Sequence, residues 1–393
     1  MISKAEITAL LKQLVEIRSE YFEEDDIMAF AQDWLQKQQI PASIFTYEEK
    51  AVTGFKGKDV IAEIDGGGKG PTICLNGHLD TVKLCSGWTK NPYGESEGEK
   101  FYGVGALDMK SGCAALMVAL ARFTRQHPKF NGKIKLSLVS VEEGPYGMGT
   151  NALIESGYLD DVDFSIITEP SAGFTGKPFP DLCLGARGGY GLEVEFFGKS
   201  AHAASPEKGC SALVDAAKVV AELENIDYVE DPYLGKGTCC VVAINSDGGA
   251  CSVPDFASIK LFWHIVTGEN PDTIVREIDK AVQRAQIKSQ YKIKFREAPS
   301  EESKGFLPYT VDRDEPMVVS FIDSVKAVTG KEPTISYFNS IGDFCYLGTR
   351  LHAPAVIFGA DGKNYHSEDE YVLLDSVQQT AQTVYHFLEK TLL

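Results

Sequence analysis

The stretch Pro71-Thr-Ile-Cys-Leu-Asn-Gly-His-Leu-Asp80 decides the fold class, because a short apolar run leads directly into a histidine and an aspartate. We predict strands over 59–64, 71–75, 133–141 and 163–168, with a helix over 109–123. Strands that alternate with helices indicate an α/β sheet, whose functional sites form at the carboxyl ends of strands. The glycine-rich stretch 65–70 lacks the Gly-Lys-Ser/Thr ending of a phosphate-binding loop, so we interpret it as a hairpin turn.

The middle of the chain has a different pattern. Leu192, Val194 and Phe196 alternate with other residues as in a strand with one buried face. The predicted order is strand, helix, strand, strand, helix, strand, over residues 191–197, 211–223, 238–245, 256–266, 271–285 and 291–296. This order is the ferredoxin-like pattern. We therefore expect a small domain, residues 185–296, inserted into a larger one formed by residues 1–184 and 297–393.

Composition excludes several classes of protein. The chain has 393 residues, 44% hydrophobic and 24% charged, which is typical of a globular protein and not of a disordered or disulfide-stapled one. Its net charge of −18 repels phosphate backbones and anionic lipid, so we expect neither nucleic acid nor a membrane as partner. The nine cysteines form no Cys-x-x-Cys pair, and residues 1–21 favour an amphipathic helix over a signal peptide. These features predict a cytoplasmic protein with reduced thiols.

Five segments place a side chain of the metal-binding type at the end of a predicted strand or beside a glycine-rich turn. They contain His78 with Asp80, Asp108, Glu142 with Glu143, Glu169, and His366. On a strand, residues two apart share a face, so Asp80 is expected to orient the His78 imidazole. Each segment alone is weak evidence for a metal site. The five together are stronger evidence, because an α/β sheet gathers strand ends at one edge.

Charge determines what such a cluster requires. Five carboxylates would meet there, and at about 4 Å and an effective dielectric constant of about 20 each close pair costs about 4 kcal/mol. Two divalent cations remove this repulsion, since three ligating carboxylates and one bridging hydroxide neutralise two Zn²⁺ ions. Mixed imidazole and carboxylate ligands suit zinc, with cobalt or manganese as substitutes.

These residues carry a family resemblance that covers nearly the whole chain. The sequence resembles the dinuclear zinc aminoacylase family, which includes acetylornithine deacetylase, succinyl-diaminopimelate desuccinylase and carboxypeptidase G-like metallopeptidases. The matching motifs are Asn76-Gly-His-Leu-Asp-Thr-Val82, Gly103-Val-Gly-Ala-Leu-Asp-Met-Lys110, Glu142-Glu143-Gly144, Thr168-Glu-Pro170, Gly198-Lys-Ser-Ala-His-Ala-Ala204 and His366-Ser-Glu-Asp-Glu-Tyr371. The resemblance implies a mixed-sheet catalytic domain of the zinc-exopeptidase type, with the inserted domain as a lid that also forms a homodimer.

The resemblance also implies roles for individual residues. Asp108 would bridge the two metals, His78 and Glu169 would complete one metal site, and Glu143 and His366 the other. Glu142 would be the general base, which moves a proton from the bridging water to the leaving amine. His202 would donate to the oxyanion, often in the partner subunit's active site. A cis peptide bond is expected at Asp108–Met109.

Departures from the family pattern limit any prediction of the substrate. His264 stands where the family commonly has an arginine that clamps a substrate carboxylate, and a histidine cannot form that bidentate fork. Cys251 stands where the family has an asparagine. Arg187 is a candidate carboxylate contact or a hinge residue packed on its own loop, and Asp343 resembles part of a substrate-side loop.

We therefore predict a dizinc amidohydrolase that cleaves a small N-acyl amino acid or short peptide. One alternative is a dipeptidase or aminopeptidase that requires a free amine, and another is a non-catalytic relative that binds metal or ligand. A glycosidase with two carboxylates is disfavoured, because it would leave the histidines without a role and the chain has only three Trp to stack on sugars.

Overall fold

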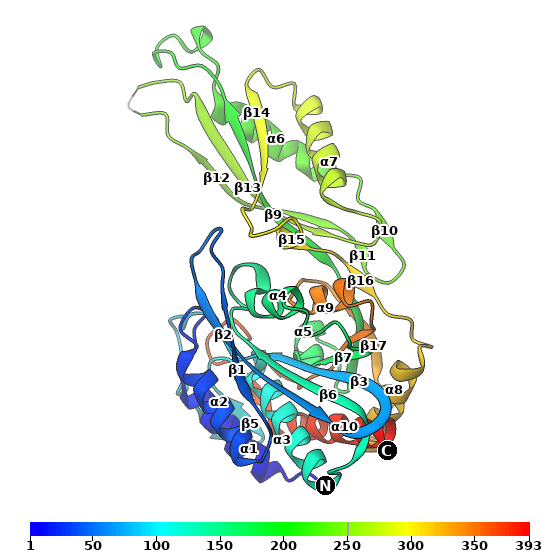
Figure 1. The fold of residues 1–393 in the computed structure, drawn as a ribbon. Coiled ribbons are helices and arrows are strands. Elements are labelled where there is room, and N and C mark those ends of the chain that lie inside the picture. Colours follow the sequence, from blue (N-terminus) through cyan, green and yellow to red (C-terminus); the bar gives the residue numbers. More distant parts are fainter. Residues whose placement is uncertain (250) are drawn as a thin grey trace. The chain divides into compact units, whose positions relative to one another are not determined.

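The structure, a computed structural model, describes residues 1–249 and 251–393, and these form two compact units. The first unit comprises Met1–Ala186 and Thr310–Leu393, and the second comprises Arg187–Tyr309. Figure 1 shows their helices and strands, with labels where there is room. No helix among the described residues has both the length and the apolar character needed to cross a bilayer.

The first unit holds most of the secondary structure. Its elements before the second unit are α1 (Lys4–Glu16), α2 (Asp25–Lys37), β1 (Ser43–Glu48), β2 (Lys56–Asp65), β3 (Gly67–His78), β4 (Glu95–Glu97), β5 (Lys100–Tyr102), α3 (Ser111–Gln126), β6 (Phe130–Val139), α4 (Met148–Glu155), β7 (Phe164–Ile167), α5 (Ser171–Thr175) and β8 (Asp181–Ala186). Those after it are α8 (Pro316–Thr329), β17 (Thr334–Phe338), α9 (Phe344–Arg350), β18 (Ala355–Ile357), β19 (Gly362–Lys363), β20 (Tyr371–Leu373) and α10 (Leu374–Leu392), with β16 (Tyr309–Thr310) spanning the boundary.

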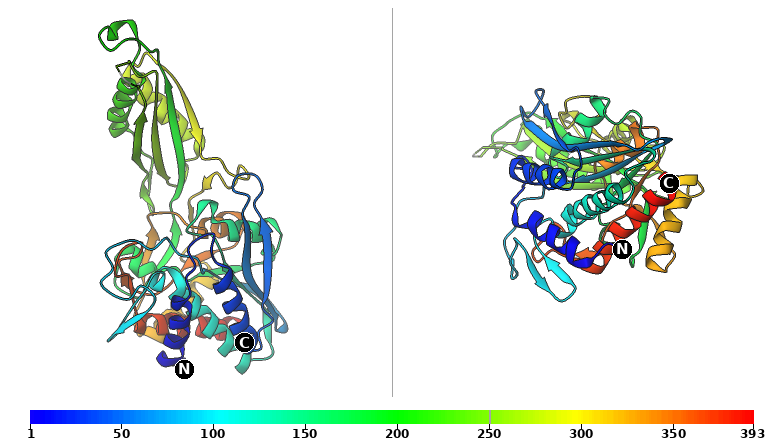
Figure 2. Two further views of the ribbon diagram at one scale, coloured as in Figure 1. Left: turned by 90° about the vertical axis from the view of Figure 1, so that its left-hand side faces the viewer. Right: turned by 60° about the horizontal axis from the view of Figure 1, so that its bottom comes forward.

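A mixed sheet forms the centre of the first unit, as expected for an α/β fold. Its strands lie in the order β1-β2-β6-β3-β7-β18-β8, and β17 pairs with β8. β3 runs parallel to both β6 and β7, and β18 runs parallel to β7. Helices α1, α3, α8 and α10 lie together along one face of this sheet (Figure 2). The carboxyl ends of β3, β6, β7 and β18 therefore meet at one edge.

One local prediction is wrong. Residues 65–70 do not form a hairpin between β2 and β3, because β6 lies between these two strands. The backbone of Gly66 instead exchanges hydrogen bonds with Phe130 and Gly132 at the start of β6. A glycine-rich turn shows that the chain reverses or bends, but burial of the strands on both sides decides which strand pairs with which.

The second unit has its own sheet and core. Its elements are β9 (Gly188–Phe197), α6 (Ala212–Glu222), β10 (Glu230–Asp231), β11 (Gly235–Lys236), β12 (Thr238–Ser246), β13 (Phe256–Ile265), α7 (Pro271–Ala285), β14 (Gln290–Phe295) and β15 (Gly305–Phe306). The strand order is β12-β13-β9-β14, with β13 and β14 both antiparallel to β9. Leu192, Val194 and Phe196 are buried in one core with residues of α6 and α7.

The unit extends further than the predicted insertion. β15 pairs with β9 through Gly305 and Phe306, so the chain stays with this unit up to Tyr309 and not only to residue 296. A two-residue strand carries no periodicity that a sequence pattern could reveal.

Candidate metal centre and active site

Most of the metal-type side chains of the first unit follow strands whose carboxyl ends share one sheet edge, and Asp108 and His366 come from other segments. His78 is the last residue of β3, and Asp80 follows it. Glu142 and Glu143 follow β6, Glu169 follows β7, and His366 lies between β19 and β20. Asp108 lies in an irregular turn, Ala106–Lys110, that leads into α3. The expected cis peptide bond at Asp108–Met109 is present.

The Asp108 carboxylate lies at the centre of this cluster. Its Oδ1 is 3.2 Å from His78 Nε2, and its Oδ2 is 3.2 Å from His366 Nε2. His78 Nε2 is also 3.4 Å from Glu169 Oε1, while His366 Nε2 is 2.7 Å from Glu143 Oε1. Ligand atoms of His78, Asp108 and Glu169 lie within 4.8 Å of one another, and so do those of Asp108, Glu143 and His366. The two oxygens of Asp108 thus face two separate sets of potential ligands.

The donor set fits divalent cations. His78 Nδ1 lies 3.0 Å from the backbone carbonyl of Asp80, so Nδ1 carries the proton of the neutral ring and Nε2 presents its lone pair to two carboxylates. Two acceptors aimed at each other need a positive charge between them. Glu169 Oε2 is buried without a hydrogen-bond partner among the described residues, which is a further acceptor that a cation would satisfy.

The pKa shifts show how strongly this cluster requires positive charge. Burial, followed by repulsion from Asp108, raises the pKa of Glu143 to about 7 and that of Glu169 to about 8. Burial also raises the pKa of Glu142 well above its ordinary value. For His366, burial acts in the opposite direction, but hydrogen bonds to Asp108 and Glu143 raise its pKa to about 11. Without cations, carboxylates and imidazoles therefore compete for shared protons.

Asp80 positions more than the imidazole. Its Oδ1 is 3.5 Å from His78 Nδ1, farther than the backbone carbonyl. The same carboxylate accepts the backbone N–H of Glu142 at 3.1 Å and that of Glu143 at 2.9 Å. Asp80 therefore ties the end of β3 to the turn that carries both glutamates.

Two more buried carboxylates hold the same turn. Asp59 Oδ1 accepts the N–H and the hydroxyl of Ser140, each at 2.9 Å, and Glu24 Oε1 accepts the N–H of Val141 at 3.2 Å. Val141 has φ of 55°, a left-handed conformation that a β-branched residue rarely adopts. Four successive N–H groups, from residue 140 to residue 143, are thus bound by buried carboxylates. The sequence analysis missed Glu24 and Asp59, since neither belongs to a recognisable motif.

Glu370 is another functional residue that the sequence analysis missed. It is buried, and its carboxylate accepts the N–H of Gly105 at 3.0 Å, of Leu107 at 2.8 Å and of Asp108 at 3.0 Å. Burial raises its pKa to about 8 although these three bonds act in the opposite direction. Glu370 lies within the quoted motif 366–371, so its position beside His366 was the available signal.

Glu142 and Asp343 are neighbours. The Asp343 N–H donates to Glu142 Oε1 at 3.0 Å, and ligand atoms of Glu142, Glu169 and Asp343 lie within 4.8 Å of one another. The Asp343 side chain is 2% exposed and accepts the hydroxyl of Thr150. Asp343 therefore lies beside the expected general base, with its carboxylate turned to α4.

A pocket opens beside the cluster within the first unit. Its volume is about 190 Å³. Asp108, Glu142, Glu143, Glu169 and His366 line one part of it, and the remainder is lined by Phe174, Phe338, Asn339, Ser340, Ile341, Phe344 and Tyr365. The carboxylates and His366 thus face the same pocket as these aromatic residues.

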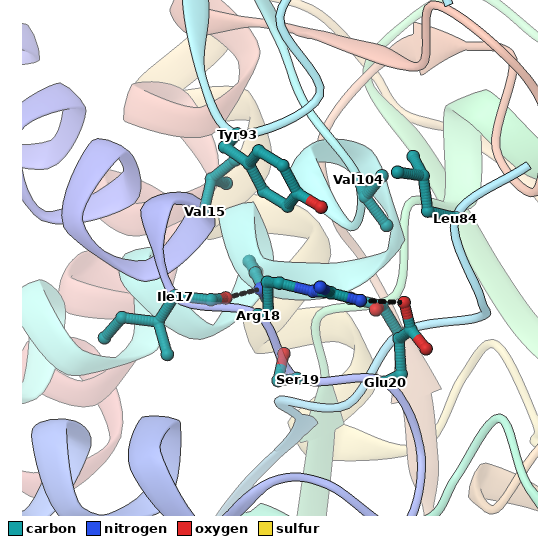
Figure 3. A pocket seen from close by; sticks show the side chains of 10 residues that line it. Val15, Ile17, Arg18, Ser19, Glu20, Leu84, Tyr93 and Val104 are labelled. Atoms are coloured by element: carbon teal, nitrogen blue, oxygen red, sulfur yellow. Dashed lines mark hydrogen bonds and ion pairs between the residues drawn. The ribbon is translucent and has the colours of Figure 1, made fainter. Parts of the chain in front are cut away.

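Lys110, next to the cluster in sequence, faces a different place. Its Nζ donates to the backbone carbonyl of Ile17 at 2.8 Å, at a small hollow that Arg18, Glu20 and Tyr93 also line (Figure 3). Burial lowers the pKa of Lys110 to about 7. Lys110 therefore anchors the Asp108 turn to the chain after α1.

The remaining predicted site residues belong to the second unit. His202 is exposed, and its Nδ1 accepts the Ala204 N–H at 3.0 Å, which leaves the proton of the neutral ring on Nε2. The Cys251 carbonyl accepts the Ala203 N–H at 2.9 Å, and His202 bridges to Ser252, so this unit brings His202 and Cys251 together.

Arg187 and His264 are half-buried in the second unit. Arg187 Nε donates to the Leu234 carbonyl at 2.9 Å. Burial, and then the charge of Arg187, lower the pKa of His264 to about 4, so His264 is neutral at pH 7. A neutral imidazole does not replace the bidentate arginine of the family pattern.

Comparison with known proteins identifies relatives over almost the whole chain. Succinyl-diaminopimelate desuccinylase of Orientia tsutsugamushi (strain Boryong) is 25% identical and covers 99% of this chain and 97% of its own length. The desuccinylase of Paracoccus denitrificans is 28% identical over 81% of this chain and 83% of its own length.

Solved structures share the fold. Aminopeptidase PepT from Bacillus cereus has a TM-score of 0.79 at 18% identity, with 99% of both chains covered. An M20 family metallo-carboxypeptidase from Sulfolobus solfataricus has a TM-score of 0.77 at 19% identity, covering 100% of this chain and 99% of its own. The family model described as "Peptidase family M20/M25/M40" matches residues 74–390, which is well over half of the chain. The chain therefore belongs to peptidase family M20/M25/M40 and is a metal-dependent hydrolase of amide bonds in acyl amino acids or short peptides.

Proposed function

We propose that this protein is a co-catalytic dizinc amidohydrolase whose two metal sites share Asp108. His78 and Glu169 would complete one site, and Glu143 and His366 the other. The proposal rests on the placement of the two Asp108 carboxylate oxygens. Oδ1 lies 3.2 Å from His78 Nε2, and Oδ2 lies 3.2 Å from His366 Nε2. Zinc suits this mixture of imidazole and carboxylate ligands, and cobalt or manganese would be substitutes.

Bound cations would supply Lewis acidity that activates water and polarises the scissile carbonyl. Glu142 would accept the proton of the attacking water and deliver it to the leaving amine. Three features support this assignment. Glu142 lines the pocket, its backbone N–H is held by Asp80, and its Oε1 is oriented by the Asp343 N–H.

The second unit would act as a ferredoxin-like lid and dimerisation domain. Its strand order and its two helices support the ferredoxin-like assignment. His202 would donate an Nε2–H to the developing oxyanion, in its own or in the partner's site. Arg187, Cys251 and His264 would be substrate contacts from this unit.

A homodimer would form through edge strand β12. Val241, Val242 and Ile244 on this strand are exposed, and pairing across a two-fold axis would cover them. Light scattering tests this proposal, because a monomer mass at micromolar concentration would contradict it. We also propose that the enzyme is cytoplasmic, where its nine free cysteines would remain reduced.

Primary-amine release tests the activity. Zinc- or cobalt-loaded enzyme is offered N-acyl amino acids and free dipeptides, beside a chelator-treated control. Chelator-sensitive release supports the proposal, and the pattern across the panel separates a deacylase from a dipeptidase. If enzyme with two metals bound releases no amine from any substrate of the panel, the proposal is contradicted.

A further inference from the structure

The pocket beside the carboxylate cluster has an aromatic wall formed by Phe174, Phe338, Phe344 and Tyr365. Phe174 and Phe338 are stacked, with ring centroids 4.7 Å apart and planes at 25°. Tyr365 meets Phe174 edge-on at 4.8 Å, and Phe344 meets Phe338 edge-on at 5.4 Å. The four rings form one packed cluster from three separate segments of the chain, namely α5, the end of β17 with the start of α9, and the loop after β19, and Phe174 and Tyr365 are its more exposed members.

This wall borders the reacting groups directly. Tyr365 precedes His366, and their ring centroids are 5.6 Å apart. Phe344 follows Asp343, whose N–H holds Glu142. A group attached to the carbonyl or the nitrogen of an amide at the cluster would therefore lie against these rings.

Away from the carboxylates and His366, the lining is apolar or uncharged. Apart from the carboxylates and His366, the described residues that line the pocket are the four aromatics, Ile341, Ser340 and Asn339, and none of them is Lys or Arg. A carboxylate placed against the four rings, away from His366 and the metal ligands, would lose water and find no counter-charge on the wall, which disfavours an anionic group there. The rings offer apolar area and stacking geometry to a flat group.

We propose that the aromatic wall selects an apolar, preferably planar group on one side of the scissile amide, and rejects an anionic one. This inference rests on the proposed amidohydrolase function and names its substrate class. It separates the chain from its relatives named for a succinyl substrate, whose acyl group carries a carboxylate. The group could belong to the acyl side or to the amine side, and both sources share the same chemistry.

Two substrate series distinguish these sources. The first varies the acyl group on glycine, using acetyl, hexanoyl, benzoyl and succinyl. The second keeps the acetyl group and varies the amino acid, using glycine, leucine, phenylalanine and aspartate, with the matching glycyl dipeptides. We expect kcat/KM for the aromatic member of one series to exceed that of its smallest member by about tenfold or more. The anionic member should be the poorest of that series.

Substitution at Phe174 tests whether the wall causes the preference. Phe174 is half-buried, so its removal disturbs the core less than removal of Phe338 or Phe344. Phe174→Ala should reduce the ratio of kcat/KM for the aromatic member to kcat/KM for the smallest member of the same series, about three- to tenfold. Phe179→Ala is the matched control, because Phe179 is also half-buried and packs on Phe358, outside the pocket. The control should keep the wild-type ratio.

Binding gives a readout that does not depend on turnover. Benzoyl-glycine, succinyl-glycine, acetyl-phenylalanine and acetyl-aspartate are titrated by calorimetry into metal-loaded Glu142→Gln, with and without the additional Phe174→Ala substitution. Benzoyl-glycine should bind more tightly than succinyl-glycine, or acetyl-phenylalanine more tightly than acetyl-aspartate, and Phe174→Ala should remove the difference. This result supports the wall even if every substrate stays uncleaved, in which case only the proposed function fails. The proposed role of the wall is contradicted if the anionic members are cleaved as fast as the aromatic members or faster, or if Phe174→Ala keeps the wild-type preference. Either result leaves the proposed amidohydrolase activity standing.

Discussion

At the scale of single residues, the chemistry depends on carboxylates in different surroundings. Without cations the His78 and His366 rings are protonated, and their hydrogen bonds to Asp108 lower its pKa although burial acts in the opposite direction. Glu142, a pocket residue, has burial as the main influence on its pKa, which is raised. Burial also raises the pKa of Glu143 and Glu169, so what distinguishes Glu142 is its position, since it lies in the pocket outside both sets of ligand atoms around Asp108.

Glu142→Gln should therefore lower kcat by about 10²- to 10⁴-fold, because the amide keeps the bond from Asp343 but cannot accept a proton. Metal content by mass spectrometry should stay at the wild-type value. Glu155→Gln on α4, where Glu155 is exposed, is the control and should change kcat less than about twofold. Retention of more than a tenth of kcat by Glu142→Gln would remove Glu142 from its assigned role.

Glu370→Gln should weaken metal binding about 10- to 100-fold, since Glu370 binds three N–H groups of the turn that carries Asp108. The amide substitutes one acceptor oxygen by a donor, so the variant should also lose roughly 2 kcal/mol of stability. Competition with a fluorescent zinc chelator measures the affinity, and urea unfolding measures the stability. Glu368→Gln, two residues away and exposed, should match the wild type in both; equal metal affinity in Glu370→Gln would contradict the account.

The sequence could single out the metal-type residues because each lies in a short motif, and the structure brings His78, Asp108, Glu143, Glu169 and His366 within reach of one another. The sequence could not predict Glu370 or Asp59 as partners of backbone N–H groups. Glu370 is 262 residues from Asp108 in the chain, and Asp59 is 81 residues from Ser140. Such pairs depend on the folded backbone and leave no local pattern.

At the scale of elements, Asp59 joins β2 to the end of β6, and this contact should make stability depend on pH. Burial raises the pKa of Asp59 from 3.8 to about 7, so the folded chain keeps a proton that the unfolded chain releases. Between about pH 4 and pH 7 the unfolding free energy should then fall as pH rises, by up to about 1.4 kcal/mol per unit. Burial also raises the pKa of Glu24, to about 8, which adds to the same trend.

Asp59→Asn should make this dependence less steep, because the amide carries no proton to lose, while Glu24 still contributes. Urea unfolding of chelator-treated protein at pH 5, 6, 7 and 8 measures the slope. Asp65→Asn, at the exposed end of the same strand, should keep the wild-type slope. An Asp59→Asn slope equal to that of the wild type would show that Asp59 is ionised in the folded protein.

Element boundaries followed the sequence patterns closely where periodicity was strong, as for α7, predicted and observed over 271–285. Strand neighbours were harder to predict. The order β2-β6-β3 places a strand from 130–139 between two strands that are adjacent in sequence. Only the combined burial of all three strands determines that order, and no single window of sequence contains it.

At the scale of the whole molecule, metal removal should destabilise the first unit, because its clustered carboxylates then repel one another without a neutralising cation. A ligand at 100 times its Kd stabilises a protein by about 2.7 kcal/mol. For a unit of this size, that corresponds to about 5–10 °C in Tm. Calorimetry of chelated and zinc-restored protein measures the shift. Asp108→Asn should show little metal-dependent change in Tm, and a wild-type Tm indifferent to chelation would contradict a metal site of this kind.

The two-unit organisation was predicted from the change between strand-helix alternation and the pattern over 191–296. The later boundary, at Tyr309, depends on β15 pairing with β9. The sequence predicted an N-acyl amino acid or short peptide as substrate, but not the proposed preference for an apolar group, because Phe174, Phe338 and Tyr365 come from distant segments and gather only in the folded pocket.

The most direct test of the central claim is amine release during stepwise metal loading of chelated enzyme, with metal bound per chain measured at each step. The account predicts that activity rises until two metals are bound per chain, then stays constant, and that Glu142→Gln binds the same two metals with at least about a hundredfold lower kcat. Full activity in metal-free enzyme, or undiminished activity in Glu142→Gln with two metals bound, would contradict it.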